Sequence, residues 1–218
     1  MKEKLLIIKQ NKVVSSFNER SKQLVEKAIS KTEKFFGQKV NFKVIFIDTR
    51  EEMDKVYSEF FGEKHKTDDW VVGGVFQNNI VYMFAEEIYS KVSCHPQETF
   101  FPTLVHEITH IFTKELFDFH LPKWLNEGIS YVVAEQDKQS LKEKKDITKA
   151  FTEQEWAQMR PYLTAGKFTR FLLEKYGKDK IFNLMKSLSP LAKKDEFEKK
   201  FREIFRESFN VIWNEWSN

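Results

Sequence analysis

Short apolar runs in the first half of the chain predict strands. Residues 5–8 and 42–47 are rich in Leu, Ile, Val and Phe, which favour a pleated, partly buried surface. Two further runs, 70–76 and 80–84, flank the polar segment Gln77-Asn78-Asn79. A turn of this kind between two apolar runs predicts a β-hairpin. The first hundred residues therefore supply the strands of the fold.

Two helices are predicted between these strands by their start and stop signals. Residues 18–36 carry apolar side chains at helical spacing, and Gly37 follows as a stop signal. Thr49 with Glu52 forms a capping-box pattern for a second helix, which we expect to end near Gly62. The N-terminal part is thus mixed α and β.

Gly73 and Gly74 lie inside the first strand of the predicted hairpin. Glycine weakens a strand interior unless a bulge or a close approach of another backbone requires it. A plain bulge is one explanation. A bound extended peptide is another, and on that explanation Gly73 and Gly74 are the candidate substrate-binding residues.

The second half of the chain has an almost wholly helical pattern. Apolar residues recur at helical spacing over 100–117, over 123–135 and in several segments between 153 and 216. The polar segment 136–149 predicts an exposed connection. Because strands come first and helices follow, the order of elements predicts an α+β fold.

Length and composition favour one folded domain. The chain has 218 residues, of which 41% are hydrophobic and 15% aromatic, enough to bury one sizeable core. We therefore predict a single domain, 1–218, with a strand-rich part (1–97) and a helical part (98–218). Only 7 Gly and 5 Pro argue against a disordered or fibrous chain.

Charge and cysteine content exclude some classes of partner. The net charge of +3 arises from Lys and Arg interleaved with Asp and Glu, so we expect neither nucleic acid nor a membrane as a partner. The one cysteine, Cys94, permits no internal disulfide, which favours a cytoplasmic setting. The apolar run 5–8 is too short for a signal-peptide core, and no segment reaches transmembrane length.

A possible metal site lies in the predicted helix 100–117. This segment contains His106-Glu107-Ile108-Thr109-His110, the HExxH pattern. Histidines four residues apart lie one above the other on a helix, so His106 and His110 can bind one zinc ion. Glu107, between them in sequence, can then act on a water bound to that ion. The alternative is a surface helix with these residues on its wet face. The apolar stripe of the same helix comprises Phe101, Leu104, Val105, Ile108, Ile111 and Phe112.

Glu127 is the candidate third ligand. It lies in the helix that follows Pro122, on the side away from that helix's apolar residues, and 17 positions after His110. This spacing leaves enough chain to turn and bring a carboxylate back to the imidazoles. A His₂Glu set leaves a fourth position open, as hydrolytic zinc sites require. Asp118 and His120, in the connecting loop, are the alternative third ligands.

The segments HEITH (106–110) and WLNEG (124–128) together resemble the gluzincin zinc metallopeptidases, in particular the peptidase MA-like and aminopeptidase N-like branch. The resemblance implies a thermolysin-like zincin fold, in which a small mixed sheet and an active-site helix precede a mainly helical lobe. It also implies one zinc ion and cleavage of peptides or unfolded protein. A weaker similarity covers 162–177, where such proteins place a tyrosine that stabilises the transition state.

Three departures from related families limit the resemblance. Thr113 and Leu116 stand where metzincins need Gly and His, so that branch is excluded. Tyr131 stands where thermolysin-like relatives carry an acid that orients the first histidine, which leaves the partner of His106 unassigned. No acidic motif precedes the active-site helix to anchor a substrate amino terminus, so exopeptidase activity is not predicted.

The residues so assembled predict metal-assisted hydrolysis. Zinc lowers the pKa of its water to about 7 and polarises a carbonyl, while Glu107 serves as general base. The developing oxyanion needs a further donor. By resemblance this donor is Tyr162, and Tyr131, one turn after Glu127, is the alternative.

Other candidates have simpler explanations. Cys94 beside His95 lacks an Asn or Asp partner that would indicate a thiol site, and a lone cysteine is more often structural. An aromatic series at helical spacing predicts core packing: Phe201, Phe205, Phe209, Trp213 and Trp216.

Two other function classes remain beside a peptidase. The same ligands would serve a zinc hydrolase acting on a non-peptide substrate. A catalytically silent, zincin-like binding protein is disfavoured by the intact Glu107, because binding a metal requires ligands and no base.

Overall fold

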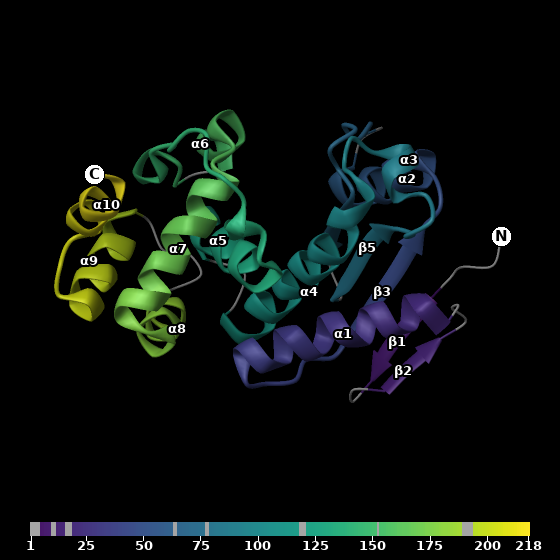
Figure 1. The fold of residues 1–218 in the computed structure, drawn as a ribbon, viewed down its shortest axis with the longest axis horizontal. Coiled ribbons are helices and arrows are strands. Elements are labelled where there is room, and N and C mark those ends of the chain that lie inside the picture. The colour runs from purple at the N-terminus through teal and green to yellow at the C-terminus, as the bar shows by residue number, and fades with distance from the viewer. Residues whose placement is uncertain are drawn as a thin grey trace. The chain divides into compact units, whose positions relative to one another are not determined.

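The computed structural model describes residues 5–9, 12–15, 19–62, 65–76, 79–117, 121–151, 153–188 and 194–218, the first two ranges by their backbone alone (Figure 1). The chain divides into two units, Met1–Phe112 and Thr113–Asn218, each considered by itself below. The division falls inside the helix that carries the HExxH pattern, whereas the sequence suggested a change of character at 97/98. The single domain stays a prediction.

The first unit contains a mixed five-stranded sheet with the order β2-β1-β3-β5-β4. β3 and β5 are parallel, and the other neighbouring pairs are antiparallel. The strands are β1 (Leu5–Lys9), β2 (Lys12–Ser15), β3 (Phe42–Ile47), β4 (Gly73–Phe76) and β5 (Ile80–Phe84). The predicted strands are present, and β2, whose segment is too short and polar for a clear pattern, is an addition.

β4 begins at Gly73, three residues later than predicted, and the segment before it is bonded to helix α2 (Arg50–Phe61). The Arg50 guanidinium donates to the carbonyls of Asp68 (3.0 Å) and Val71 (2.6 Å). The Asp54 carboxylate accepts the Thr67 N–H at 2.7 Å. These backbone groups are therefore satisfied by α2 side chains, while the Val72 carbonyl still accepts the Phe84 N–H of β5 at 3.1 Å.

The helices of the first unit begin and end largely where their caps predicted. α1 spans Glu19–Phe36 and is followed by Gly37 in the left-handed conformation, at φ 70°. The Thr49 hydroxyl caps α2 by accepting the Glu52 N–H (3.2 Å). The Glu52 carboxylate accepts from the Asp48 N–H (3.0 Å), one residue before the capping residue, so the capping box is shifted by one position. The remaining helices are α3 (Tyr89–Val92), a 3₁₀ turn (Gln97–Thr99) and α4 (Phe100–Phe117).

Helices cover both faces of the sheet. On one face, Phe42 and Phe46 of β3 pack against Phe112 and Phe100 of α4, with ring centroids 6.3 and 6.1 Å apart. On the other face, aromatic side chains of α2 meet those of the hairpin, as in the stacked pair Phe60–Phe76 at 4.4 Å. Residues of opposite parity along a strand point to opposite faces, so α4 and α2 lie on different sides of the β4–β5 hairpin.

The second unit is helical and is built around Trp124, which is fully buried. Its indole ring lies 5.7 Å from Phe168, 5.9 Å from Phe197 and 5.2 Å from Phe209. The helices are α5 (Lys123–Ala134), α6 (Glu153–Met159), α7 (Tyr162–Tyr176), α8 (Lys178–Ser187), α9 (Lys194–Phe205) and α10 (Phe209–Ser217). The predicted core packing of the aromatic series is confirmed for four members, which are buried on α9 and α10: Phe201, Phe205, Phe209 and Trp213.

The segment 136–149 is largely exposed, as its polarity predicted, with two exceptions. Asp137 and Ile147, each in a short 3₁₀ turn, are both buried. Asp137 receives two hydrogen bonds from the Arg170 guanidinium of α7, at 2.8 and 3.2 Å. Pairing with Arg170 allows a charged residue to be buried in a segment whose composition indicates solvent.

α5 and α7 approach closely where each presents a glycine. A Cβ atom on Gly128 would lie 2.8 Å from the Ala165 carbonyl oxygen, and one on Gly166 would lie 2.7 Å from the Tyr131 Cβ. Both distances are shorter than the 3.5–4.0 Å of a normal contact. The position of α5, including the WLNEG segment, is therefore set by backbone contact with α7.

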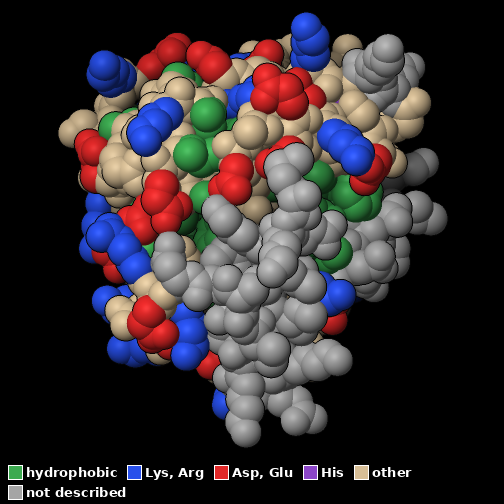
Figure 2. Space-filling view, turned by 90° about the vertical axis from the view of Figure 1, so that its right-hand side faces the viewer, with side chains coloured by type: hydrophobic (Ala, Val, Ile, Leu, Met, Phe, Trp, Pro, Cys, Tyr) green, Lys and Arg blue, Asp and Glu red, His purple; other side chains and the backbone are tan. Residues whose placement is uncertain are grey.

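The described surface shows mixed charge. Figure 2 shows one face, on which Lys and Arg side chains are interspersed with Asp and Glu. This agrees with the net charge of +3. Among the described residues, no helix has both the length and the apolar character needed to cross a bilayer.

Candidate metal centre

The HExxH pattern lies on α4 as predicted, with both imidazoles turned to the same point. The Nε2 atoms of His106 and His110 are 3.0 Å apart, and the ring planes are nearly perpendicular, at 83°. His106 is only 9% exposed. The two histidines therefore do not lie on the wet face of a surface helix, because residues around most of the circumference of α4 are buried or half-buried.

Glu127 is buried as well, at 5% exposed, although the sequence placed it away from the apolar side of its helix. The sequence pattern of α5 shows where its apolar residues lie but does not reveal that its polar side is also covered. The Thr113 hydroxyl in the last turns of α4 donates to the Asn126 side-chain oxygen at 2.7 Å. This bond fixes the residue next to Glu127 against the end of the helix that carries the histidines.

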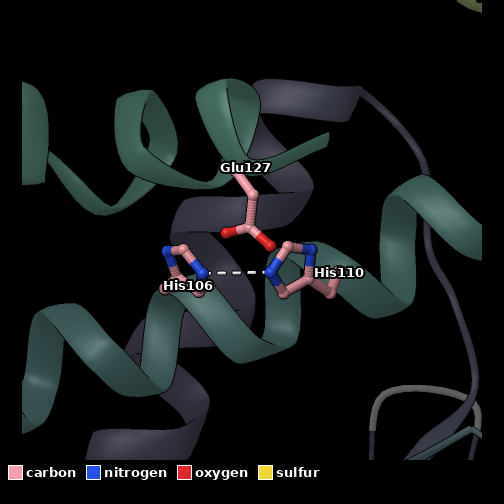
Figure 3. A group of neighbouring side chains, drawn as sticks. All are labelled: His106, His110 and Glu127. Atoms are coloured by element: carbon pink, nitrogen blue, oxygen red, sulfur yellow. Dashed lines mark hydrogen bonds between the residues drawn. The ribbon is translucent and has the colours of Figure 1, made fainter. Parts of the chain in front are cut away.

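His106, His110 and Glu127 are brought together as the sequence predicted. Each offers a ligand atom, and these atoms all lie within 4.8 Å of one another. Figure 3 shows the Glu127 carboxylate pointing toward the gap between the two facing imidazole nitrogens. The three side chains are close enough to hold one metal ion.

The donor set fits zinc. Zinc bonds to histidine nitrogen are about 2.0–2.1 Å long, so two ligands of a tetrahedral ion are about 3.3 Å apart. The two Nε2 atoms are already near that separation, at 3.0 Å. The 4.8 Å bound for the carboxylate is within the movement that rotation about the Glu127 side chain allows. Two imidazoles and one carboxylate also leave a tetrahedral ion one open position.

The alternative ligands Asp118 and His120 lie outside the described residues. Cys94 is exposed, and the ring of its neighbour His95 is hydrogen-bonded through Nε2 to the Trp70 carbonyl at 2.9 Å. The histidine is thus engaged with the backbone of the segment that precedes β4.

Glu107 is half-buried and lies against Gly73 of β4. A Cβ atom on Gly73 would come within 3.3 Å of the Glu107 Cγ and 2.9 Å of the Tyr82 carbonyl oxygen. The pairing of β4 with β5 runs without interruption from Gly73↔Met83 to Phe76↔Ile80, which excludes a bulge over these residues. The glycine at 73 is instead explained by a close approach of its neighbours.

Gly74 faces the other side of the sheet. A Cβ atom there would lie 3.0 Å from the Tyr57 hydroxyl and 3.1 Å from the Phe76 ring. The same Tyr57 hydroxyl donates to the Gly73 carbonyl at 3.0 Å. Only Gly73 of the two glycines is therefore placed beside Glu107, and its carbonyl already accepts a hydrogen bond.

β4 is the last strand of the sheet, so one of its edges has no neighbouring strand among the described residues. The Phe84 N–H donates to the Val72 carbonyl at 3.1 Å, and this bond shows which residues of β4 direct their backbone groups to β5. In an antiparallel pair every second residue directs its polar groups to the partner. The backbone N–H and C=O groups of Gly74 therefore face β5, and the same groups of Gly73 and Val75 face the open edge.

Tyr131 and Tyr162 both lie near Glu127 in the second unit. Their rings stack, with centroids 6.1 Å apart. Burial, and after it the negative charge of Glu127, raises the pKa of each phenol above its ordinary value. Both hydroxyls therefore remain protonated at neutral pH, as a hydrogen-bond donor must. The stacking places both candidates at the same location, and the choice between them stays open.

Lys123 is a further neighbour of Glu127, one that the motifs in the sequence did not single out. Its ammonium lies 3.5 Å from Glu127 Oε1, and its side chain is 30% exposed. The signal was present in the sequence, because residues four apart on a helix lie next to each other. Lysine is not a candidate metal ligand, because an ammonium group does not ligate a metal.

Comparisons of the chain with known protein families, with curated proteins and with solved structures gave no match. The resemblance to gluzincins therefore rests on the motif residues themselves and on how the fold brings them together.

Proposed function

We propose that the protein is a zinc-dependent hydrolase, and that its substrates are peptides or unfolded protein. The observation that carries the proposal is the convergence of His106, His110 and Glu127, with Glu107 between the two histidines on the same helix. A site that only held a metal would need its ligands, but it would not need a further carboxylate next to them.

The proposed reaction assigns a separate task to each residue. His106, His110 and Glu127 would hold the ion, which would supply a Lewis acid for a carbonyl and lower the pKa of a water to about 7. The Glu107 carboxylate takes a proton from the attacking water and passes it to the leaving amine. The hydroxyl of Tyr162 or of Tyr131 donates to the oxygen on which negative charge develops.

A peptide is favoured over other substrates by the strand next to Glu107. β4 has an open edge among the described strands, and an extended chain can add to such an edge through backbone hydrogen bonds. Gly73, which carries no side chain, lies between this edge and the proposed base. This geometry supports the proposal that Gly73 contacts the substrate backbone. For Gly74, on the opposite face, the proposal is weaker. The cytoplasmic setting belongs to the proposal too, and exposed Cys94 is compatible with it.

The decisive experiment replaces the proposed base and leaves the ligands intact. Glu107→Gln should keep about one zinc per chain by elemental analysis and lose at least about 100-fold in turnover of a peptide library, since general-base catalysis contributes about 10²–10⁴. Glu115→Gln, an exposed position on the same helix, is the matched control and should retain activity. Glu127→Ala should lower the zinc content.

A different experimental result would contradict each part of the proposal. Equal turnover in Glu107→Gln would remove Glu107 from the mechanism. Full zinc occupancy in Glu127→Ala would require another third ligand. A zinc-loaded wild-type protein that cleaves no member of the library would exclude the peptidase in favour of a non-peptide substrate or a silent binding protein.

A further inference from the structure

Lys123 and Glu127 form an ion pair within α5, and the two partners are unequally buried. The ammonium lies 3.5 Å from Glu127 Oε1, and the exposed fractions of the side chains are 30% for the lysine and 6% for the glutamate. The lysine therefore reaches from partial solvent to a carboxylate that solvent hardly touches. Both residues belong to the second unit, so the contact lies within one unit.

The stability of α5 does not explain a lysine at this position. Lys123 is the first residue of the helix, and Pro122 before it makes no side-chain cap. A cation in the first turn opposes the helix dipole, at a cost of about 0.3–1 kcal/mol. A lysine that precedes a glutamate by four residues is also the less favourable order for a helical ion pair. The contact with Glu127 offsets this local disadvantage.

The surroundings of Glu127 call for a compensating charge. Its described neighbours include the phenol groups of Tyr131 and Tyr162, which are neutral when protonated, and the two imidazoles. A buried carboxylate without a cation is costly, and such a group tends to turn toward solvent. That movement would withdraw the third ligand from the histidines.

We propose that Lys123 is a positioning residue for the third metal ligand. Its ammonium holds one oxygen of the Glu127 carboxylate, so that the group stays directed at His106 and His110. The inference rests on the metal site of the proposed function, but it does not require peptide cleavage. Lys123 touches neither substrate nor ion in this arrangement, and it acts through Glu127.

Two effects of Lys123 on metal affinity oppose each other. Its ammonium repels a divalent cation, so its removal could tighten binding. Its removal also frees the ligand, and loss of a residue that orients a ligand typically weakens affinity about 10–100-fold. Because the lysine side chain is 30% exposed, solvent screens the repulsion, and we expect the loss of positioning to dominate.

The test measures zinc affinity by competition with a chromophoric chelator, a readout that does not depend on turnover. Lys123→Met should bind zinc about 10-fold more weakly than the wild type. Lys123→Arg, which keeps the charge, should stay within about 3-fold of the wild type. Lys186→Met, which removes an exposed lysine from α8, is the control and should leave the affinity unchanged.

A double-mutant cycle with Glu127→Gln separates positioning from a general structural effect. In the Glu127→Gln background the carboxylate is gone, so Lys123→Met should change the remaining zinc affinity less than about 3-fold. An undiminished effect of about 10-fold in that background would overturn the proposal. Unchanged or tighter zinc binding by Lys123→Met in the wild-type background would do the same.

The outcomes also distinguish this inference from the proposed function. Zinc binding without cleavage of any peptide, together with the expected effects of Lys123, would leave the positioning role standing and remove only the peptidase. A wild-type chain that binds no zinc would overturn both.

Discussion

Replacement of Gly128 by alanine should destabilise the protein, although alanine is the better helix former. In an exposed helix, Gly→Ala stabilises by about 0.5–1 kcal/mol. At position 128 the new Cβ would lie 2.1 Å from the Thr169 hydroxyl oxygen, 2.8 Å from the Ala165 carbonyl oxygen and 3.1 Å from the Thr169 Cβ. The last two contacts are near the backbone of α7 and cannot be relieved by rotating a side chain.

The expected loss of stability is the cost of overpacking minus the gain in helix propensity. Overpacking of a buried contact typically costs about 1–3 kcal/mol, and contacts as short as these belong to the upper part of that range. Subtracting the gain in helix propensity leaves a net loss of about 1–2 kcal/mol. For a chain of this size, that corresponds to a fall in Tm of about 2–8 °C.

Urea and thermal unfolding of the wild type and the variant would measure this loss. Thr169→Ala, which removes the hydroxyl involved in the shortest contact, should restore part of the stability when combined with Gly128→Ala. A Gly128→Ala protein as stable as the wild type, or more stable, would refute the inferred close packing of α5 on α7. The same displacement would move Glu127, so zinc affinity should fall together with stability.

Two ion pairs give further predictions. Arg170→Met should lower the free energy of unfolding in urea by about 3 kcal/mol, because it leaves the Asp137 carboxylate buried without its partner. Asp137→Ala should lower it less, because Arg170 is 34% exposed and can turn to solvent. A larger loss of stability in Asp137→Ala than in Arg170→Met would contradict this order. Burial alone would raise the pKa of Asp146, but hydrogen bonds from Thr148 and Lys149 outweigh it and lower the pKa below its ordinary value. Their contribution to stability is therefore present above about pH 4 and lost as the pH falls through the lowered pKa of the folded state, so Asp146→Asn should be less stable than the wild type at about pH 7 and should approach it below about pH 3. A difference that stays constant with pH would contradict this assignment.

The features that could be predicted from the sequence are those set by neighbouring residues. The bounds of α4 follow from its apolar spacing, and α1 ends at Gly37 as its stop signal indicated. The HExxH pattern belongs to the same class, because helix geometry alone aligns His106 with His110. Glu127 could be selected because it lies away from the apolar side of its helix and because 17 positions after His110 leave enough chain to turn back.

The features that could not be predicted depend on residues far apart in sequence. The carbonyls of the segment before β4 are bonded to Arg50, some twenty residues upstream. The burial of Asp137 depends on Arg170 of α7. For Gly73, the sequence left open a bulge and a close approach of another backbone. The unbroken pairing with β5 excludes the bulge, and the close neighbour Glu107 lies on a helix far along the chain.

The Arg50 side chain has a consequence for mutational tolerance. It bonds to the carbonyl oxygens of Asp68, Asp69, Val71 and Val92 and to the Thr67 hydroxyl. A lysine has no planar fork with which to reach so many acceptors at once. Under the proposed hydrolase function, a random-mutagenesis screen for inactive variants should therefore recover Arg50 together with the histidines, although Arg50 has no part in the proposed chemistry. Such a hit would identify a residue that holds the segment before Gly73 against α2.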